Sequence, residues 1–280
     1  MRPESDGLVA QCTQPLPRHM SKSRTLTHEP AFVLHQYPWS ESSLILEVLT
    51  RHHGRLAVAA KGVKRPTSSF RPVLLPLQPL SLNLGGDGEI RTLKSAEWLG
   101  GHVMPTGDAL LSGFYLNELM LRLLARDDPH PALFDCYRQA VLMLAQGGEG
   151  AVAPALRAFE LVLLRDIGVL PSLNLQTLSL QDLSADAPYD LVPEGGLRLS
   201  PTPEGGDDEP RRLRLVGARW SALQQAIEGD HPFADLVRLL AQWSPEDRSA
   251  LQQQMRVMIH HHCGAEVLKT RQLMMDLQGL

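Results

Sequence analysis

The 280-residue chain has few cysteines and few aromatic residues, and both shortages exclude classes of protein. Its three cysteines, Cys12, Cys136 and Cys263, lie far apart in the sequence. This spacing excludes a disulfide-stabilised scaffold and a zinc ribbon built from paired Cys-x-x-Cys motifs. Aromatic residues make up only 5% of the chain, so we expect most of them to serve packing rather than ligand binding.

The chain also lacks any uninterrupted apolar run of the roughly 18 residues that a membrane-spanning helix needs. The first 27 residues contain no apolar segment after a basic start, so we expect no secretory signal and a cytoplasmic location. The remaining composition, with 43% hydrophobic and 21% charged residues, is typical of a soluble globular protein. The length is sufficient for two domains, each with its own core.

Acidic residues are absent from residues 48–86, a stretch that contains six lysines and arginines. The net charge of −4 is therefore unevenly distributed along the chain. Residues 30–105 carry eight basic and five acidic side chains, whereas residues 106–280 carry 15 basic and 23 acidic ones. A long basic stretch without carboxylates is typical of a surface that binds a polyanion such as nucleic acid. A solvated basic surface without a ligand is the less favoured alternative.

Residues 30–105 show the pattern of a small β-barrel. Four or five short runs of strand-forming residues alternate with turn residues, at 31–35, 43–50, 55–61, 80–84 and 89–98. Closure into a barrel would leave no exposed strand edges. Residues 61–72 have no strand period and carry four basic side chains, so we predict a basic loop between the third and fourth strands.

Basic side chains on and around this loop form the predicted nucleic-acid surface. In barrels of the oligonucleotide-binding type, cations follow the phosphates while aromatic side chains stack on the bases. The candidate cations are Arg51, Arg55, Lys61, Lys64, Arg65, Arg71, Arg91 and Lys94. The candidate stacking residues are Tyr37, Trp39 and Phe70, although packing in the barrel core explains each of them more readily.

Residues 106–280 are predicted to be helical, with one irregular insertion. Helices are expected at 109–125, 131–146 and 154–167, and a further helix begins at the N-cap Ser244 and ends at Gly264. Residues 171–215 are rich in Asp, Pro, Ser and Gly and include a hairpin pattern at 189–199. A lone hairpin has little stability of its own, so we expect this insertion to be poorly ordered or packed on the helices.

The sequence contains no catalytic motif of the common kinds: no Walker A loop, GxSxG, HExxH or GxGxxG. The one metal-like cluster is His260-His-His-Cys263. Neighbouring residues on a helix point about 100° apart, so these side chains cannot close one tetrahedral site. The sequence therefore predicts a binding protein, not an enzyme, that uses no metal or other cofactor.

Several segments in the two halves follow one another in a familiar order. The first half contains Ala31-Phe-Val-Leu-His, Trp39-Ser-Glu-Ser-Ser-Leu, His53-Gly-Arg, Val58-Ala-Ala-Lys-Gly-Val-Lys-Arg, Leu75-Pro-Leu-Gln-Pro-Leu and Gly86-Asp-Gly-Glu-Ile-Arg. The second half contains Tyr115-Leu-Asn-Glu-Leu, Ala155-Leu-Arg-Ala-Phe-Glu-Leu, Gly168-Val-Leu-Pro and, more weakly, Leu268-Lys-Thr-Arg. Together these segments resemble the RecO family of bacterial recombination mediators. The resemblance covers residues 30–170 well and residues 171–250 poorly.

The resemblance implies an α+β multidomain chain: an N-terminal OB-fold barrel over residues 30–105, then an all-α C-terminal domain over residues 106–280. It also implies a monomer that binds single- and double-stranded DNA in the nucleoid, anneals complementary strands, and helps RecR to load RecA onto single-stranded DNA coated by single-strand-binding protein (SSB). The residues themselves leave two alternatives open, an RNA-binding OB protein and a protein-docking adaptor. Residues 1–29 have no counterpart in the family and are expected to form a disordered extension, with Met20 as an alternative start.

The resemblance carries two further expectations for the helical part. Many relatives have four zinc-binding cysteines after the Gly-x-x-Pro turn, but residues 171–175 and 199–203 contain none here, so the insertion is expected to be a degenerate zinc-finger-like module without metal. Arg157 matches a basic family position that receives the acidic, apolar C-terminal tail of SSB. Leu156 and Phe159 are the expected apolar contacts of that tail, although core packing explains both equally well.

Overall fold

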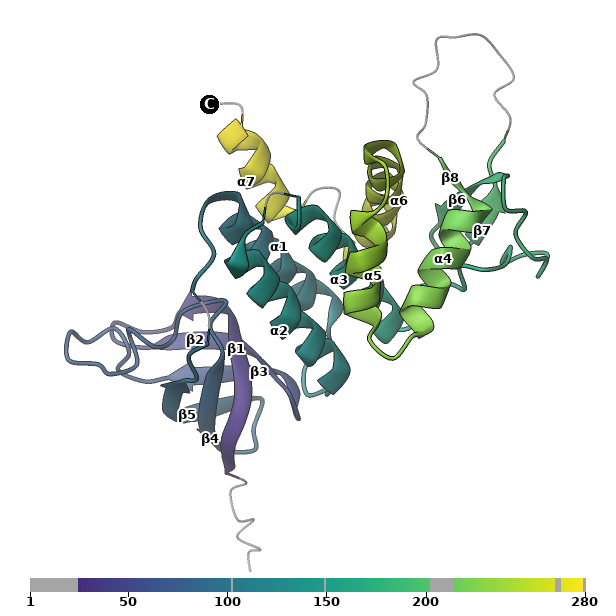
Figure 1. The fold of residues 1–280 in the computed structure, drawn as a ribbon. Helices are drawn as coiled ribbons and strands as arrows, with labels where there is room; N and C mark the ends of the chain where they lie inside the picture. Colours follow the sequence, from purple (N-terminus) through teal and green to yellow (C-terminus); the bar gives the residue numbers. More distant parts are fainter. Residues whose placement is uncertain (1–24, 102, 149, 202–213, 265–267, 279–280) are drawn as a thin grey trace, which may run out of the picture.

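The computed structural model describes residues 25–101, 103–148, 150–201, 214–264 and 268–278 (Figure 1). A closed five-stranded β-barrel comes first in the chain, and a largely helical region follows. The prediction of an OB-like barrel joined to a helical region is confirmed. The helical region is not all-α, however, because it also contains a three-stranded sheet, which lies at the opposite end of the molecule from the barrel.

The barrel strands are β1 (Leu26–Pro38), β2 (Leu44–Thr50), β3 (Gly54–Ala60), β4 (Leu80–Gly85) and β5 (Ile90–Trp98). They close in the order β1-β2-β3-β5-β4, with β3 and β5 parallel and every other pair antiparallel. Alternate side chains point inward, as the strand period requires. They fill the interior with aliphatic residues such as Leu46, Val48, Val58 and Leu82.

The barrel begins before residue 30, where the sequence analysis placed its start. Leu26 is buried and its backbone pairs with Leu84 of β4, so residues 26–29 are part of the barrel wall and not of an extension. The sequence did not indicate that β1 begins before Pro30, because proline donates no hydrogen bond to a strand ladder and is typical of a strand end. The rest of the predicted extension, residues 1–24, lies outside the described residues.

The helices of the second region are α1 (Gly107–Leu123), α2 (Pro131–Gln146), α3 (Val152–Asp166), α4 (Gly217–Glu228), α5 (Pro232–Ala241), α6 (Pro245–Cys263) and α7 (Lys269–Gln278). The predicted start and end of α6 are confirmed. The Ser244 hydroxyl accepts a hydrogen bond from the Asp247 backbone N–H at 3.1 Å, and Gly264 follows the helix at a φ of 60°. The sequence analysis did not predict α4, α5 and α7.

The hairpin in the insertion forms as predicted, from β6 (Pro188–Val192) and β7 (Gly196–Leu199). A short third strand, β8 (Leu215–Val216), pairs with β6. The hairpin is packed on the helices: the Leu191 backbone N–H donates to the Gln254 side chain on α6 at 2.9 Å, and Gln254 in turn donates to Asp190 at 3.2 Å. Residues 202–213 of the insertion lie outside the described residues.

One outer face of the barrel is buried against α1 and α2. The Phe32 ring lies 5.4 Å from the ring of Phe134 and 5.0 Å from that of Tyr137. The Tyr137 hydroxyl donates to the Asn117 side chain at 2.5 Å, and the Asn117 amide donates to the Leu34 backbone carbonyl at 3.1 Å. The two regions therefore share one continuous core, to which the barrel contributes Phe32, Leu34, Leu49 and Leu77.

Gly54 is expected to be indispensable where the barrel contacts the segment after α1. Its φ is 69°, and a Cβ atom there would overlap the backbone carbonyl of Asp128. Gly54→Ala should therefore lower the free energy of unfolding by about 2 kcal/mol or more, through backbone strain and loss of this contact. The control is Gly168→Ala, because Gly168 has a φ of 77° but open space at its Cβ position. Equal losses in urea unfolding of the two variants would contradict the role of the contact.

Candidate nucleic-acid interface and interhelical cleft

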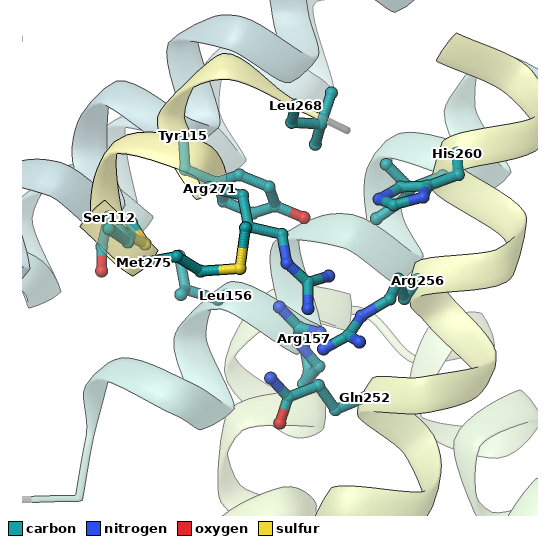
Figure 2. Close-up of a pocket in the computed structure, with 12 residues that line it drawn as sticks. Ser112, Tyr115, Leu156, Arg157, Gln252, Arg256, His260, Leu268, Arg271 and Met275 are labelled. Atoms are coloured by element: carbon teal, nitrogen blue, oxygen red, sulfur yellow. The ribbon is translucent and has the colours of Figure 1, made fainter. Parts of the chain in front are cut away.

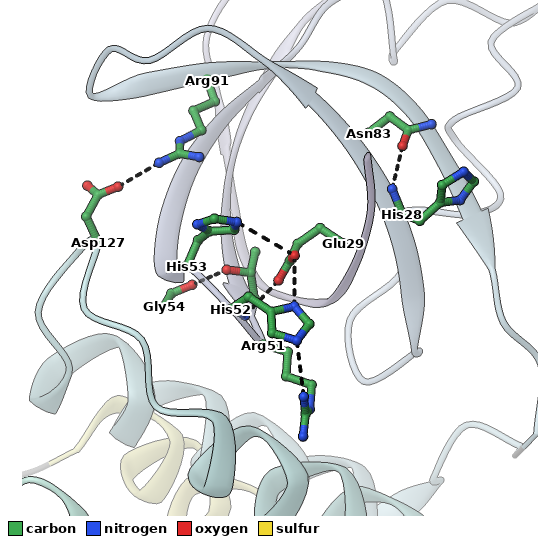
Figure 3. A network of polar contacts seen from close by, with 10 residues as sticks. His28, Glu29, Arg51, His52, His53, Gly54, Asn83, Arg91 and Asp127 are labelled. Carbon is green, nitrogen blue, oxygen red and sulfur yellow. Dashed lines mark hydrogen bonds and ion pairs between the residues drawn. The ribbon is translucent and has the colours of Figure 1, made fainter. Parts of the chain in front are cut away.

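Three of the eight candidate cations on the barrel are bound to carboxylates. The Arg51 Nη2 lies 2.8 Å from Asp135 Oδ2 on α2. The Arg91 Nη2 lies 3.1 Å from Asp127 Oδ1, a pair drawn in Figure 3. The hydrogen bond from Arg51 holds the pKa of the Asp135 carboxyl below its usual value, against the opposing effect of burial. These two ion pairs therefore join the barrel to the helical region.

The third of these cations, Arg55, belongs to a buried cluster. Its Nη1 lies 3.0 Å from the Oε2 of Glu47, and Arg126 binds the other oxygen of the same carboxylate. The Glu47 side chain is 3% exposed. A carboxylate can be buried in this way only when cations compensate its charge. The prediction that Arg55 contacts nucleic acid therefore conflicts with its position, because its guanidinium is needed by Glu47.

The turn between β2 and β3 is closed over a second buried carboxylate. Glu29 of β1 accepts a hydrogen bond from the His52 backbone N–H at 2.8 Å, and the His52 ring lies 3.1 Å from its other oxygen. His53 lies 3.9 Å from the same oxygen (Figure 3). The two histidines thus hold the turn to β1 and do not extend the basic loop.

The other five candidate cations leave the barrel surface positive. Lys61, Lys64, Arg65 and Arg71 lie in the loop after β3, and Lys94 lies on β5; within the described part of the chain, none of them forms an ion pair with a carboxylate. All are exposed except Lys64, which is half-buried. Lys64 and Arg71 also line a pocket of about 270 Å³ at the base of the loop. We call residues 61–72 the basic loop.

The basic loop is fastened to the turn that carries Trp39. The Lys64 backbone N–H donates to the Ser42 carbonyl at 3.0 Å, and the Lys64 Nζ donates to the Ser40 carbonyl at 2.9 Å. Trp39 is 54% exposed and Tyr37, at the end of β1, is 46% exposed. Phe70, in contrast, is half-buried and packs against the barrel core. Of the three candidate stacking residues, Trp39 is therefore exposed on the turn that holds the basic loop, and Tyr37 is exposed at the end of β1.

A cleft of about 280 Å³ lies among α1, α3, α6 and α7 (Figure 2). Leu156 and Arg157 of α3 line it. Phe159, which was expected to make an apolar contact there, does not. It is fully buried, and its ring packs edge-on against Tyr137 of α2 at 6.1 Å. That expectation is corrected because Phe159 belongs to the core shared by α2 and α3.

A buried carboxylate lies under the cleft. Glu160 is fully buried and accepts hydrogen bonds from the Tyr115 hydroxyl at 2.6 Å and from the Arg157 Nη2 at 2.5 Å. Burial raises the pKa of Glu160, although Arg157 and Tyr115 both favour its ionised form. Arg157 is therefore held in place by an internal partner while one side of it lines the cleft.

Most residues of the cleft were not predicted from the sequence. Tyr115, Arg256 and Arg271 line it from three different helices, and only tertiary packing brings them together. One local signal was available: Arg157 and Glu160 are three residues apart, a spacing at which opposite charges meet on a helix. No comparable signal linked Arg256 to Arg271, because α7 was not predicted.

The described ranges contain neither a candidate metal site nor a candidate membrane-spanning helix. In those ranges, no group of three or more His, Cys, Asp or Glu side chains is placed to hold a metal ion. Residues 171–175 and 199–201, where the family resemblance would place zinc ligands, contain no cysteine. Nor does any helix among the residues with described positions have the length and apolar character to cross a membrane.

Both halves of the chain match models of one protein family. Residues 20–102 match the family model "Recombination protein O N terminal", and residues 104–272 match "Recombination protein O C terminal". The expectation that residues 1–29 have no counterpart in the family is therefore wrong for residues 20–29. Similar relatives, each called DNA repair protein RecO, come from Variovorax paradoxus (58% identical over 93% of this chain and 100% of the relative), Polaromonas naphthalenivorans (57%, over 92% and 99%) and Delftia acidovorans (56%, over 93% and 100%). The chain therefore belongs to the RecO family.

Proposed function

We propose that this chain is a DNA repair protein that acts as a recombination mediator without using a nucleotide. It binds single- and double-stranded DNA, anneals complementary strands, and helps RecR to load RecA onto SSB-coated DNA in the bacterial cytoplasm. The relatives named above are all DNA repair proteins, and they match nearly the whole chain. Binding, not chemical catalysis, is the activity that these surfaces support.

The observation that carries the DNA-binding proposal is the basic loop, which is hydrogen-bonded to the turn that carries the exposed Trp39. Lys61, Arg65 and Arg71 are exposed cations without an internal carboxylate partner among the described residues. Neutralising phosphates on two strands at once lowers their mutual repulsion, which favours annealing. Trp39 and Tyr37 offer stacking surfaces that tolerate any base, as binding without sequence preference requires.

The interhelical cleft supports the proposed contact with SSB. A C-terminal peptide that is both acidic and apolar needs a cationic site for its carboxylates and an apolar surface for its hydrophobic side chain. The cleft offers both, because arginines and apolar residues line it together, among them Arg157, Leu156, Ile259 and Met275. Docking there would bring the basic loop to DNA that SSB already covers.

We expect the basic loop to dominate the salt dependence of DNA binding. Replacing Lys61, Lys64 and Arg65 together by Ala should weaken binding and reduce the slope of log K against log salt by about 2, since each phosphate contact releases about 0.7–0.9 counterion. The measurement is fluorescence anisotropy of a labelled single strand over a range of salt concentrations. The control removes three exposed arginines of the helical region, Arg138, Arg198 and Arg238.

An unchanged slope in the loop variant would show that DNA binds elsewhere. A slope that falls equally in the control would show that only overall charge matters. Competition between matched DNA and RNA strands separates the proposal from an RNA-binding function, because only RNA offers a 2′-hydroxyl.

The cleft is expected to bind a synthetic peptide with the acidic, apolar C-terminus of SSB. Leu156→Glu should weaken that binding by about tenfold or more, because it places a carboxylate in the cleft and removes an apolar contact. Val257→Glu is the matched control, since Val257 is exposed on α6 but does not line the cleft. Titration calorimetry of both variants is the measurement, and DNA affinity should stay unchanged. Equal peptide affinities of the two variants would exclude the cleft as the site.

A further inference from the structure

Two leucines project into solvent from the insertion between α3 and β6. Leu178 is 73% exposed and Leu180 is 75% exposed. Both belong to a small hairpin, residues 175–182, whose ends are paired by a bridge between Leu175 and Asp182. We call this hairpin the insertion tip. Single exposed leucines are common on protein surfaces, but leucines grouped on one turn are typical of a surface that a partner covers.

Hydrogen bonds hold the insertion tip in one conformation. The Gln176 backbone N–H donates to the Gln181 carbonyl, and the Leu180 N–H donates to the Gln176 carbonyl, both at 2.8 Å. The Thr177 N–H donates to the Leu197 carbonyl at 3.3 Å, which fastens the tip to β7. Because the tip is already ordered, a partner that binds it loses little free energy to fixing its shape.

The surroundings of the tip are negatively charged. Residues 171–201 contain four carboxylates and one arginine. Asp182, at the base of the tip, and Asp186 are exposed, and neither forms an ion pair with any Lys, Arg or His that the structure describes. A surface that complements the tip should therefore combine an apolar pocket with a cation.

A pocket with these properties lies on the same chain, where the barrel meets α2. Its volume is about 380 Å³, and the buried side chains of Phe32, Leu80 and Phe134 line it. Leu99, which is 58% exposed, and Arg138 also line it. We call it the junction pocket. The exposure of Leu99 shows that the apolar lining continues to the protein surface.

Arg138 gives the junction pocket a positive charge. Its Nη2 lies 3.9 Å from Asp135 Oδ1, but the same carboxylate binds Arg51 at 2.8 Å. One carboxylate thus faces two arginines, and Arg138 is exposed. The basic loop lines a different pocket, so an occupant of the junction pocket would leave the proposed DNA surface open.

We propose that the insertion tip of one copy of this chain docks into the junction pocket of a second copy, with Leu178 and Leu180 in the pocket and Asp182 close to Arg138. The insertion and the barrel lie at opposite ends of the molecule, so the tip and the pocket meet between copies and not within one chain (Figure 1). Such a head-to-tail contact leaves one free tip and one free pocket, to which further copies can add. This inference goes beyond the proposed function.

The contact is expected to be weak in free solution. Two leucines and one ion pair make a smaller contact than the roughly 1,200 Å² or more that a stable interface buries. A DNA strand that holds several copies raises their local concentration, so the same contact becomes effective there. The free protein is therefore expected to be monomeric at low concentration, and copies are expected to line up on a strand.

The interhelical cleft is the competing site for the tip, because apolar residues and arginines line it as well. The junction pocket is the larger of the two, about 380 against 280 Å³. A folded hairpin needs more room than the end of an extended chain, which favours the junction pocket. Self-association should therefore persist in Leu156→Glu, which places a carboxylate in the cleft.

Sedimentation velocity over a range of protein concentrations tests the contact without DNA. The weight-average mass of the unmodified protein should rise with concentration. Leu178→Ser combined with Leu180→Ser should weaken self-association by about tenfold or more, because two apolar side chains leave the pocket. Val257→Ser, which changes an exposed apolar residue of α6, is the matched control and should associate like the unmodified protein.

Charge reversal identifies the pocket that receives the tip. Asp182→Arg and Arg138→Glu should each weaken self-association by about tenfold, and both changes in one chain should restore it to within about threefold. Asp230→Arg, at an exposed position after α4, controls for the change in net charge. Recovery in the doubly changed chain also shows that neither single variant is misfolded.

Mixing distinguishes a head-to-tail contact from a symmetric one. The Leu178→Ser/Leu180→Ser variant keeps an intact pocket, and Arg138→Glu keeps an intact tip. An equimolar mixture should therefore form pairs that neither variant forms alone, and no longer assemblies.

On DNA the contact should appear as cooperative binding. A labelled single strand that holds several copies should bind the unmodified protein about tenfold more tightly per copy than a strand that holds one, and the leucine variant should lose this difference. The leucine variant should bind the shorter strand like the unmodified protein, since its basic loop is unchanged.

The outcomes separate this inference from the proposed function. No binding to either strand would overturn the DNA-binding proposal but not the self-association measured without DNA. The present inference would be overturned by a mass that stays constant up to the solubility limit or by equal association of the leucine variant and Val257→Ser. Self-association lost in Leu156→Glu but kept in Arg138→Glu, or no pairs in the mixture, would overturn it as well.

Discussion

The buried Glu47 carboxylate, held between Arg55 of the barrel and Arg126 after α1, is the interaction on which the arrangement of the two regions depends. A carboxylate so deeply buried needs both cations, and removing either would leave an uncompensated charge in the core. Two exposed or half-exposed arginine–aspartate pairs cross the same junction. The three barrel arginines at this junction, Arg51, Arg55 and Arg91, are therefore all paired with carboxylates. Among the described barrel residues, the lysines and arginines that remain without a carboxylate partner are those of the basic loop and Lys94 of β5.

This junction explains part of the uneven distribution of charge along the sequence. Part of the acidic excess of the helical region neutralises the barrel arginines that face it, so the two regions attract each other where they touch. Within the same acidic region, however, the interhelical cleft is locally positive because Arg256 and Arg271 lie side by side without a described carboxylate partner. Net charge over a long range of residues thus indicates how regions associate, but it does not predict the potential of a particular cleft.

Features that depend on neighbouring residues could be predicted from the sequence, and features that depend on packing could not. The barrel strands follow from alternation, and the ends of α6 follow from Ser244 and Gly264, because these signals act within one or two turns. The basic loop was predicted for the same reason. The ion pair between Arg55 and Glu47, which conflicts with the assignment of Arg55 to the nucleic-acid surface, could not be predicted because nothing local reveals that Glu47 needs its charge. Phe159 was misassigned because its periodicity shows that one face of α3 is apolar, but not which neighbour covers that face.

The shared core has a consequence for how this barrel can be used in evolution and in engineering. Phe32, Leu34, Leu49 and Leu77 point outward from the barrel wall and are buried only because α1 and α2 cover them. A barrel excised from the chain would present these side chains to water and would tend to associate through them. Unlike an OB module joined by a linker, it cannot be moved to another protein unless that protein supplies an equivalent apolar surface. The barrel and the helical region are therefore expected to fold as one unit.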